Sequence, residues 1–160
     1  MAKSFRFEIV TPEKLFYHGK AELVIARTLS GDEGFMAGHS WAFKLLGTGE
    51  LWFKEAGAKD FKLAAISGGF IDVSDNVLIF TDSAEWPEEI DIGRANAAGL
   101  REQEWLETHK AGDKDTGTVL LSFSESDGII TSEDIEEHKQ AAKRAVNRQK
   151  VAAGGGRQPH

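Results

Sequence analysis

The sequence predicts an all-β N-terminal sandwich or barrel followed by a pair of α-helices. Up to about Trp86, apolar residues recur at every second position in short runs separated by turn residues, which is the pattern of half-buried strands. After Trp86 and Pro87 the apolar spacing changes to that of helices. With 41% hydrophobic and 28% charged residues, the 160-residue chain lies in the range of folded proteins, so a packed core is expected.

Six short runs carry the alternation in the first half. In "FRFEIV", Phe5, Phe7 and Ile9 share one face, and the same pattern recurs in "AELVIART", "ELWFKE", "FKLAAIS", "GFIDV" and "NVLIFTDS". Residues 74–76 read Ser-Asp-Asn, which predicts a hairpin turn between the last two runs. The glycine pair at 68–69 favours a β-bulge, with a close approach of a second backbone as the alternative.

The segment "SGDEGFMAGHSWAFKLL", residues 30–46, combines acids, glycines and a histidine before an apolar run. Asp32, Glu33 and His39 are residue types that act as general acid and base or bind a metal. No second nearby histidine and no serine nucleophile accompanies them, so we expect neither a catalytic nor a metal site. The favoured interpretation is a structural loop that the glycines turn and in which His39 bonds a backbone carbonyl.

The first helix is expected within "EEIDIGRANAAGLREQEWLETHK", with Asp91 as its N-cap and Arg94 and Arg101 on the outer surface. Its apolar stripe is expected to comprise Ile92, Ala95, Gly99, Gln103 and Leu106. Small residues bury little apolar area. Since burial stabilises by about 25 cal/mol per Å² of apolar area, such a stripe contributes little free energy. The stripe therefore predicts weak anchoring.

The second helix is expected within "TSEDIEEHKQAAKRAVNRQKVAA", capped by Thr131 or Ser132. Its narrow apolar stripe is expected to comprise Ile135, His138, Ala142, Ala145 and Val146. A helical pair built on such stripes is marginal alone, which predicts an element able to leave its docking site.

These patterns divide the chain into a β domain at 1–86, a helical hairpin at 87–153 and a flexible tail at 154–160. A long connector at 108–131 joins the helices, and its "TVLLSF" run either pairs as a short strand or lies over the first helix.

Composition excludes several function classes. The formal net charge of −7 argues against a general nucleic-acid binder, which needs a basic field. The absence of cysteine excludes disulfides, thiolate metal sites and a cysteine nucleophile. No run of 18 apolar residues occurs, so contact with a membrane is expected only through a partner.

Three stretches occur in an order and spacing that resemble a known family. These are "FEIVTPEKLFYHG" (7–19), "GFMAGHSWAFKLLGTGELW" (34–52) and "AISGGFIDVSDNVLIFTDSAEWPEEIDIGRA" (65–95). They are similar to the epsilon subunit of F-type ATP synthase (delta in mitochondria), and the match runs from about Phe5 to Ala95. The resemblance implies a sandwich of about ten antiparallel strands followed by a two-helix domain. It also implies a non-catalytic rotor subunit in the central stalk, which couples the gamma subunit to the c-ring during proton-driven ATP synthesis.

The resemblance further implies partners and sites. Asp32, Glu33 and His39 are expected at the interface with the c-ring and gamma. "IDIGRA" matches a motif with which similar bacterial subunits bind ATP. The implied ATP contacts are Ile90, Asp91, Arg94 and Ala95, joined by Arg144 and Arg148. The alternative is a helix N-terminus with a capping Asp91 and an exposed arginine, which needs no ligand. No cofactor is required; ATP would be a regulatory ligand.

Five cations with no acid among them end the second helix: Lys139, Lys143, Arg144, Arg148 and Lys150. Acids first and bases last complement the helix dipole, so a solvated helix explains them. The resemblance implies a second use, in which the extended helix contacts the catalytic alpha and beta subunits and inhibits ATP hydrolysis.

The resulting interpretation is a rotor subunit, peripheral on the cytoplasmic face of the bacterial inner (plasma) membrane as part of the synthase. The alternatives are a free-standing small β-sandwich enzyme and a nucleotide-sensing domain.

Overall fold

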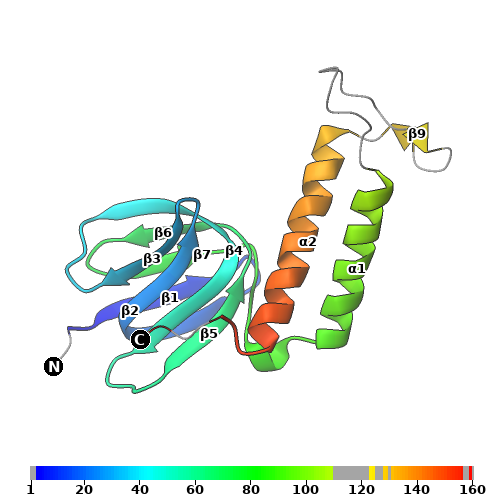
Figure 1. The fold of residues 1–160 in the computed structure, drawn as a ribbon. Coiled ribbons are helices and arrows are strands. Elements are labelled where there is room, and N and C mark those ends of the chain that lie inside the picture. Colours follow the sequence, from blue (N-terminus) through cyan, green and yellow to red (C-terminus); the bar gives the residue numbers. More distant parts are fainter. Residues whose placement is uncertain (1–2, 110–122, 125–127, 130, 157–158, 160) are drawn as a thin grey trace.

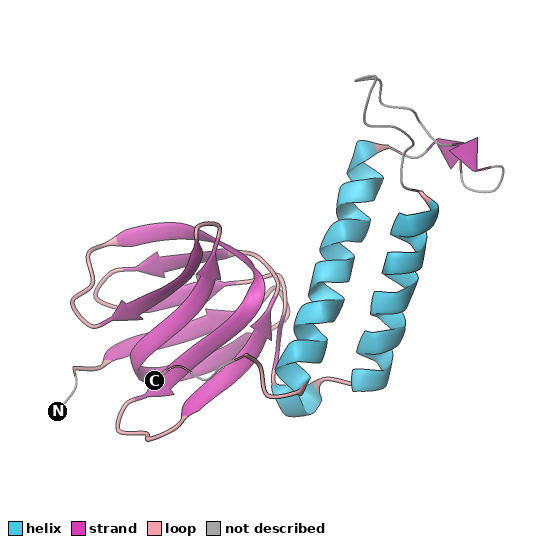
Figure 2. Cartoon of the chain, in the orientation of Figure 1, coloured by secondary structure: helices cyan, strands magenta, loops and turns pink. Residues whose placement is uncertain are grey.

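A computed structural model describes residues 3–109, 123–124, 128–129, 131–156 and 159. A β-sandwich forms the N-terminal part, and two long helices stand side by side next to it, touching it near one end (Figures 1 and 2). This confirms the predicted fold class. The "TVLLSF" run lies mostly outside the described residues.

The strands of the sandwich follow one another without an intervening helix. They are β1 (Phe5–Val10), β2 (Leu15–Thr28), β3 (Gly31–Met36), β4 (Ala42–Glu55), β5 (Phe61–Ile66), β6 (Phe70–Val73), β7 (Val77–Phe80) and β8 (Ala84–Glu85). A single 3-10 turn, η1 (Pro87–Glu89), leads to α1 (Ile92–Thr108) and, beyond the connector, α2 (Ser132–Ala152). In the connector, β9 (Phe123–Ser124) pairs with β10 (Gly128–Ile129).

Two bent strands build both layers. β2 pairs with β1 through residues 15–21 and with β3 through residues 23–28. β4 pairs with β6 through residues 42–45 and with β5 through residues 49–54. The first layer therefore runs β2–β1–β7–β6–β4, and the second runs β3–β2–β4–β5–β8. The sheet has eight strands, and β2 and β4 each contribute one segment to both layers. The two layers therefore contain the ten strand segments expected.

One pairing differs from the expected antiparallel arrangement. β1 and β7 pair in parallel, with Ile9 opposite Ile79. Parallel neighbours need a long crossover connection, and here the chain between them passes through the second layer before it returns.

The prediction of a loop over residues 30–46 was wrong for most of that segment. Residues 31–36 form β3, and β4 already begins at Ala42. In β3 only Phe35 is buried, because this strand lies at the edge of its layer and carries glycines and acids elsewhere. The alternation that marks a half-buried strand is therefore weak in the sequence.

Gly69 allows two chain segments to meet. Its φ is +104°, and a β-carbon built on it would lie 1.9 Å from the Phe80 carbonyl oxygen. The structure thus contains the close backbone approach, the less favoured alternative to a bulge. Between the layers the core is filled by fully buried aromatic and aliphatic side chains, the largest of which are Phe7, Phe35, Phe53, Ile9 and Leu51.

The helix caps agree with the sequence. The Asp91 carboxylate accepts a hydrogen bond from the Arg94 backbone N–H at 2.9 Å, and Thr131 forms a capping box with Asp134.

The expected apolar stripes are partly wrong. Ile92 and Val146 are half exposed, Gln103 is exposed, and Asn147 is buried instead. The C-terminal turns of α2, which we call its base, pack against both α1 and the second layer. The buried face of α2 is therefore wider there than an interface between two helices, and it includes the polar Asn147.

Candidate functional site

An apolar row crosses the outer face of the first layer. Its members are opposite one another in the strand register and belong to five neighbouring strands: Leu15, Val10, Phe80, Phe70 and Leu45. Leu15 and Leu45 are each 56% exposed, and Phe43, next to the row on β4, is 64% exposed. A contiguous apolar surface of this kind marks an interaction site on a folded protein.

Aromatic contacts hold the row together. The Phe70 ring lies 4.8 Å from the Phe80 ring and 4.9 Å from the Phe43 ring. A cavity of about 350 Å³ opens beside them, lined also by Val10 and Pro12. The row is therefore a continuous apolar surface with a cavity beside it, and it is a candidate interaction site. Sequence reasoning missed it, because cross-strand register is needed to see that these positions meet.

The two acids of β3 point to opposite faces, as neighbouring residues of a strand do. Asp32 binds Arg27 through two contacts, Nε–Oδ1 at 2.5 Å and Nη2–Oδ2 at 2.9 Å. Glu33 instead accepts from Lys44 and from the Thr28 hydroxyl, the latter at 2.8 Å. Two carboxylates that diverge in this way cannot share a proton or a metal.

The Glu33–Lys44 contact bridges the layers at their open edge, since β3 ends the second layer and the start of β4 ends the first. The hydrogen bond from Lys44, and then that from Thr28, hold the pKa of the Glu33 carboxyl below its ordinary value. Glu33 is therefore ionised at neutral pH and paired within the chain.

His39 stabilises the turn after β3. Its backbone N–H donates to the Met36 carbonyl at 3.1 Å, and its Nδ1 lies 2.8 Å from the Ser40 carbonyl oxygen. Its ring packs edge-on against Phe35 at 5.3 Å. In the described part of the chain, no group of three or more histidine and acidic side chains could hold a metal.

The residues of the "IDIGRA" motif occupy different environments. Ile90 is 6% exposed and Ala95 is fully buried, both in a cluster between the helices and the second layer. Asp91 caps α1, and the Arg94 side chain extends from an exposed position. Of the implied ATP contacts in this motif, Asp91 and Arg94 are therefore exposed, whereas Ile90 and Ala95 are buried.

Arg148 is held by a residue that sequence reasoning missed. Its guanidinium donates to both oxygens of Glu85 in β8, Nε–Oε2 at 2.6 Å and Nη2–Oε1 at 2.9 Å. Arg144, one turn earlier, is exposed. Glu85 stands just before the Trp-Pro boundary, and nothing in its local pattern marks it as a partner of α2.

The base of α2 is fastened to the sandwich by a buried amide. Asn147 is 9% exposed, and its Nδ2 donates to the Gly49 carbonyl at 3.0 Å and to the Ile66 carbonyl at 3.4 Å. Around it lies an apolar cluster comprising Trp52, Leu63, Ala65, Ile90, Ala95 and Val151. The helices thus dock by one end only, which Figure 1 shows.

The cations of α2 are not equivalent. Lys139, Lys143 and Arg144 are exposed, and Lys139 is 3.9 Å from Glu136. Lys150 binds Glu50 of β4 at 2.5 Å. The outward basic surface is therefore the middle of the helix, whereas its last turns contact the sandwich.

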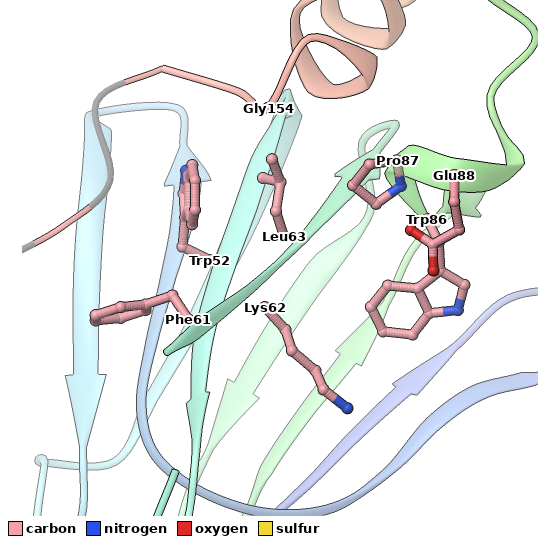
Figure 3. A pocket seen from close by; sticks show the side chains of 8 residues that line it. All are labelled: Trp52, Phe61, Lys62, Leu63, Trp86, Pro87, Glu88 and Gly154. Atoms are coloured by element: carbon pink, nitrogen blue, oxygen red, sulfur yellow. The ribbon is translucent and has the colours of Figure 1, made fainter. Parts of the chain in front are cut away.

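Beside this docking region lies a cavity of about 490 Å³ (Figure 3). Trp52 and Phe61 form one wall, Trp86 the other, and Gly154 closes one end. Lys62 and Glu88 lie at its rim, but Lys62 is bound to Glu55 at 2.9 Å. Aromatic side chains form the walls of the cavity, and the charged side chains that line it are Lys62 and Glu88.

Comparisons with known proteins agree on one family. Residues 4–87 match the family described as "ATP synthase, Delta/Epsilon chain, beta-sandwich domain". The chain is 42% identical over 111 residues to the ATP synthase epsilon chain of Alkaliphilus metalliredigens, covering 69% of this chain and 81% of that one. It is 33% identical over 145 residues to the epsilon chain of Caldicellulosiruptor saccharolyticus, covering 90% of each.

Solved structures share the fold. A chain of the Euglena gracilis mitochondrial ATP synthase, in an OSCP/F1/c-ring assembly, superposes with a TM-score of 0.68 at 20% identity, covering 90% of this chain and 78% of that chain. A chain from the Tetrahymena thermophila mitochondrial central stalk and c-ring gives 0.57 at 12% identity, with 92% and 96% covered.

Proposed function

We propose that this chain, which belongs to the delta/epsilon family of the F-type ATP synthase and is a non-catalytic subunit of its central stalk, couples gamma to the c-ring and regulates ATP hydrolysis. The sandwich would supply fixed docking surfaces, and the helices would supply the movable part. Among the described residues, neither helix has the length and apolar character to cross a membrane. We propose a peripheral place on the cytoplasmic face of the bacterial membrane, by way of the partners.

The apolar row carries the proposal for gamma. It extends over five strands and is partly or fully exposed at each member, as expected for a permanent contact whose energy comes from apolar burial. Replacing Phe70 with Asp should prevent co-purification of the chain with gamma. Leu100→Asp, at a more exposed apolar position on α1, should leave co-purification unchanged. Equal recovery of gamma with both variants would reject this surface.

For the c-ring we propose contact at the β3 end of the sandwich, where Asp32, Glu33 and His39 lie. Both acids are already paired within the chain, and an exposed ion pair contributes only about 0 to 1 kcal/mol. These acids would therefore orient the contact more than hold it.

Regulation would depend on release of the hairpin. The exposed cations Lys139, Lys143 and Arg144 would then contact acidic surfaces of the catalytic subunits. Replacing all three with alanine in the assembled synthase should raise ATP hydrolysis if the extended helix inhibits. Unchanged hydrolysis would mean that this basic surface is not the inhibitory contact.

ATP would act by favouring the folded hairpin, in proportion to its differential affinity for the two states. Arg94 and Arg144 are exposed and available for phosphate, whereas Arg148 would have to exchange Glu85 for it. Calorimetric titration of the isolated chain with ATP should show binding that Arg94→Ala abolishes. Equal heats from both proteins would reject the site.

A further inference from the structure

After α2 the chain turns and runs over the outer face of the second layer, in the segment drawn in red in Figure 1. We call residues 153–156 the strap. Its three glycines, 154–156, which begin the tail expected at 154–160, have contacts with β4, β5 and α2. The strap therefore joins the base of the movable helix to the fixed sandwich.

A helix-ending motif sets the direction of the strap. The Gly155 N–H donates to the Lys150 carbonyl at 2.8 Å and the Gly154 N–H to the Val151 carbonyl at 2.9 Å. This is the bonding pattern of a Schellman motif, whose C′ residue is usually glycine in the left-handed region. Gly154 has φ +96°, so the chain leaves α2 along one defined path.

Gly155 then packs closely against the side chains of Trp52 and Leu63 on the outer face of the second layer. Its φ is +74°, and a β-carbon on it would lie 2.8 Å from both Leu63 and Trp52 side-chain atoms. A residue larger than glycine would lift the strap off these two side chains. The following residue, Gly156, donates its N–H to both carboxylate oxygens of Glu50, at 3.0 and 2.9 Å.

Glu50 is the fixed end of the contact. Besides Gly156 it accepts from the Trp52 indole N–H at 2.8 Å and from Lys150 at 2.5 Å. Its side chain is only 13% exposed. Burial opposes its ionisation, but Lys150, the Gly156 N–H and Trp52 outweigh burial and hold the pKa of Glu50 below its ordinary value. One buried carboxylate thus binds sandwich, helix and strap together.

We propose that the strap is a latch that keeps the hairpin folded against the sandwich, and that it must leave Glu50 before the helices can undock. This rests on the proposed regulatory movement. It adds to that proposal a specific intramolecular site, made by Glu50, Trp52 and Leu63, that recognises a glycine backbone. Removing the latch shifts the hairpin toward the released state without touching the basic surface of α2.

Thiol labelling of the full chain measures undocking directly, because the sequence has no cysteine of its own. Ala65 is buried on the face that α2 covers, and its neighbour Ala64 is buried in the sandwich core. The thiol of Ala65→Cys therefore reacts when the hairpin undocks, and that of Ala64→Cys reacts only when the sandwich opens. Glu50→Gln replaces the charged acceptor of the Gly156 N–H with a neutral one. The weaker hydrogen bond should speed labelling at position 65 by about tenfold.

Two further variants separate the latch from general destabilisation. Deleting residues 154–160 should also speed labelling at position 65 and leave position 64 slow. Glu55→Gln, on the same strand but bound by Tyr17 and Lys62, should change neither rate. Unchanged labelling at position 65 in both the Glu50 variant and the deletion would overturn the latch. Since the assay uses the isolated chain, failure to bind gamma would leave these results unaffected.

Discussion

Arg148 of α2 and Glu85 of β8 form a two-point ion pair, with both carboxylate oxygens accepting from the guanidinium at 2.6 and 2.9 Å. The pair lies at the boundary between the sandwich and the hairpin, and it fixes the orientation as well as the position of the last turns of α2. Arg148, one of the three arginines that the family resemblance implies for ATP, is therefore bound to a carboxylate in the folded chain.

Glu85→Ala should weaken docking of the hairpin. The two side chains are 25% and 31% exposed, so solvent screening limits the loss to about 1 kcal/mol. Amide exchange at the base of α2 should become roughly fivefold faster, since 1.4 kcal/mol is a tenfold change, and exchange in β1 should stay the same. Glu88→Ala, at an exposed position in η1, is the matched control.

Asn147→Ala should destabilise the chain by about 1 to 3 kcal/mol, because two buried carbonyl groups, those of Gly49 and Ile66, lose their side-chain donor. Urea unfolding followed by circular dichroism measures the change. Asn96→Ala, at an exposed position of α1, should stay within about 0.5 kcal/mol of the unchanged chain. Similar values for the two variants would mean that Asn147 does not hold the helix.

Gly69→Ala should be among the most harmful single substitutions in the sandwich. Its β-carbon would lie 1.9 Å from the Phe80 carbonyl oxygen, in addition to the strain at φ +104°. Gly57→Ala provides the control, because Gly57 has φ +77° with nothing within 4 Å of the added carbon. We expect about 1 kcal/mol of destabilisation for Gly57→Ala and a much lower melting temperature, or failure to fold, for Gly69→Ala.

The Glu33–Lys44 contact should make stability depend on acid pH. The hydrogen bonds from Lys44 and Thr28 lower the folded-state pKa of Glu33. The ionised contact therefore adds to the free energy of unfolding at pH values above the unfolded pKa, about 4.3. This stabilisation is lost as the pH falls through the folded-state pKa. Melting temperatures measured between about pH 2 and pH 7 should fall less steeply toward low pH in Glu33→Gln. Glu13→Gln, in an exposed turn, should retain the slope of the unchanged chain.

Much of the fold could be predicted because it depends on local periodicity. The alternation of Phe5, Phe7 and Ile9 and the change of period after Trp86 were sufficient for the fold class, which the structure confirms. The Asp91 cap could be predicted for the same reason, since a capping side chain reaches only the next turn of its own helix. The family was identifiable from motifs in the same segments.

The sites were harder to predict, because each one joins residues far apart in the chain. The apolar row needs the register of five strands, and a shift of one residue would turn its members to the other face. Asp32 and Glu33 are adjacent in sequence but diverge because neighbouring residues of a strand point to opposite faces. The expected interface and ATP residues stay predictions until their partners are tested.

The sequence by itself determined the class of each half, their order and the helix start at Asp91, because these follow from interactions between residues a few positions apart. Only the tertiary structure decided which polar side chains hold the halves together. Glu50, Glu85 and Asn147 reach partners between 63 and 106 positions away. Pairing over such separations follows from how the layers bend and where α2 docks, and no local pattern encodes it.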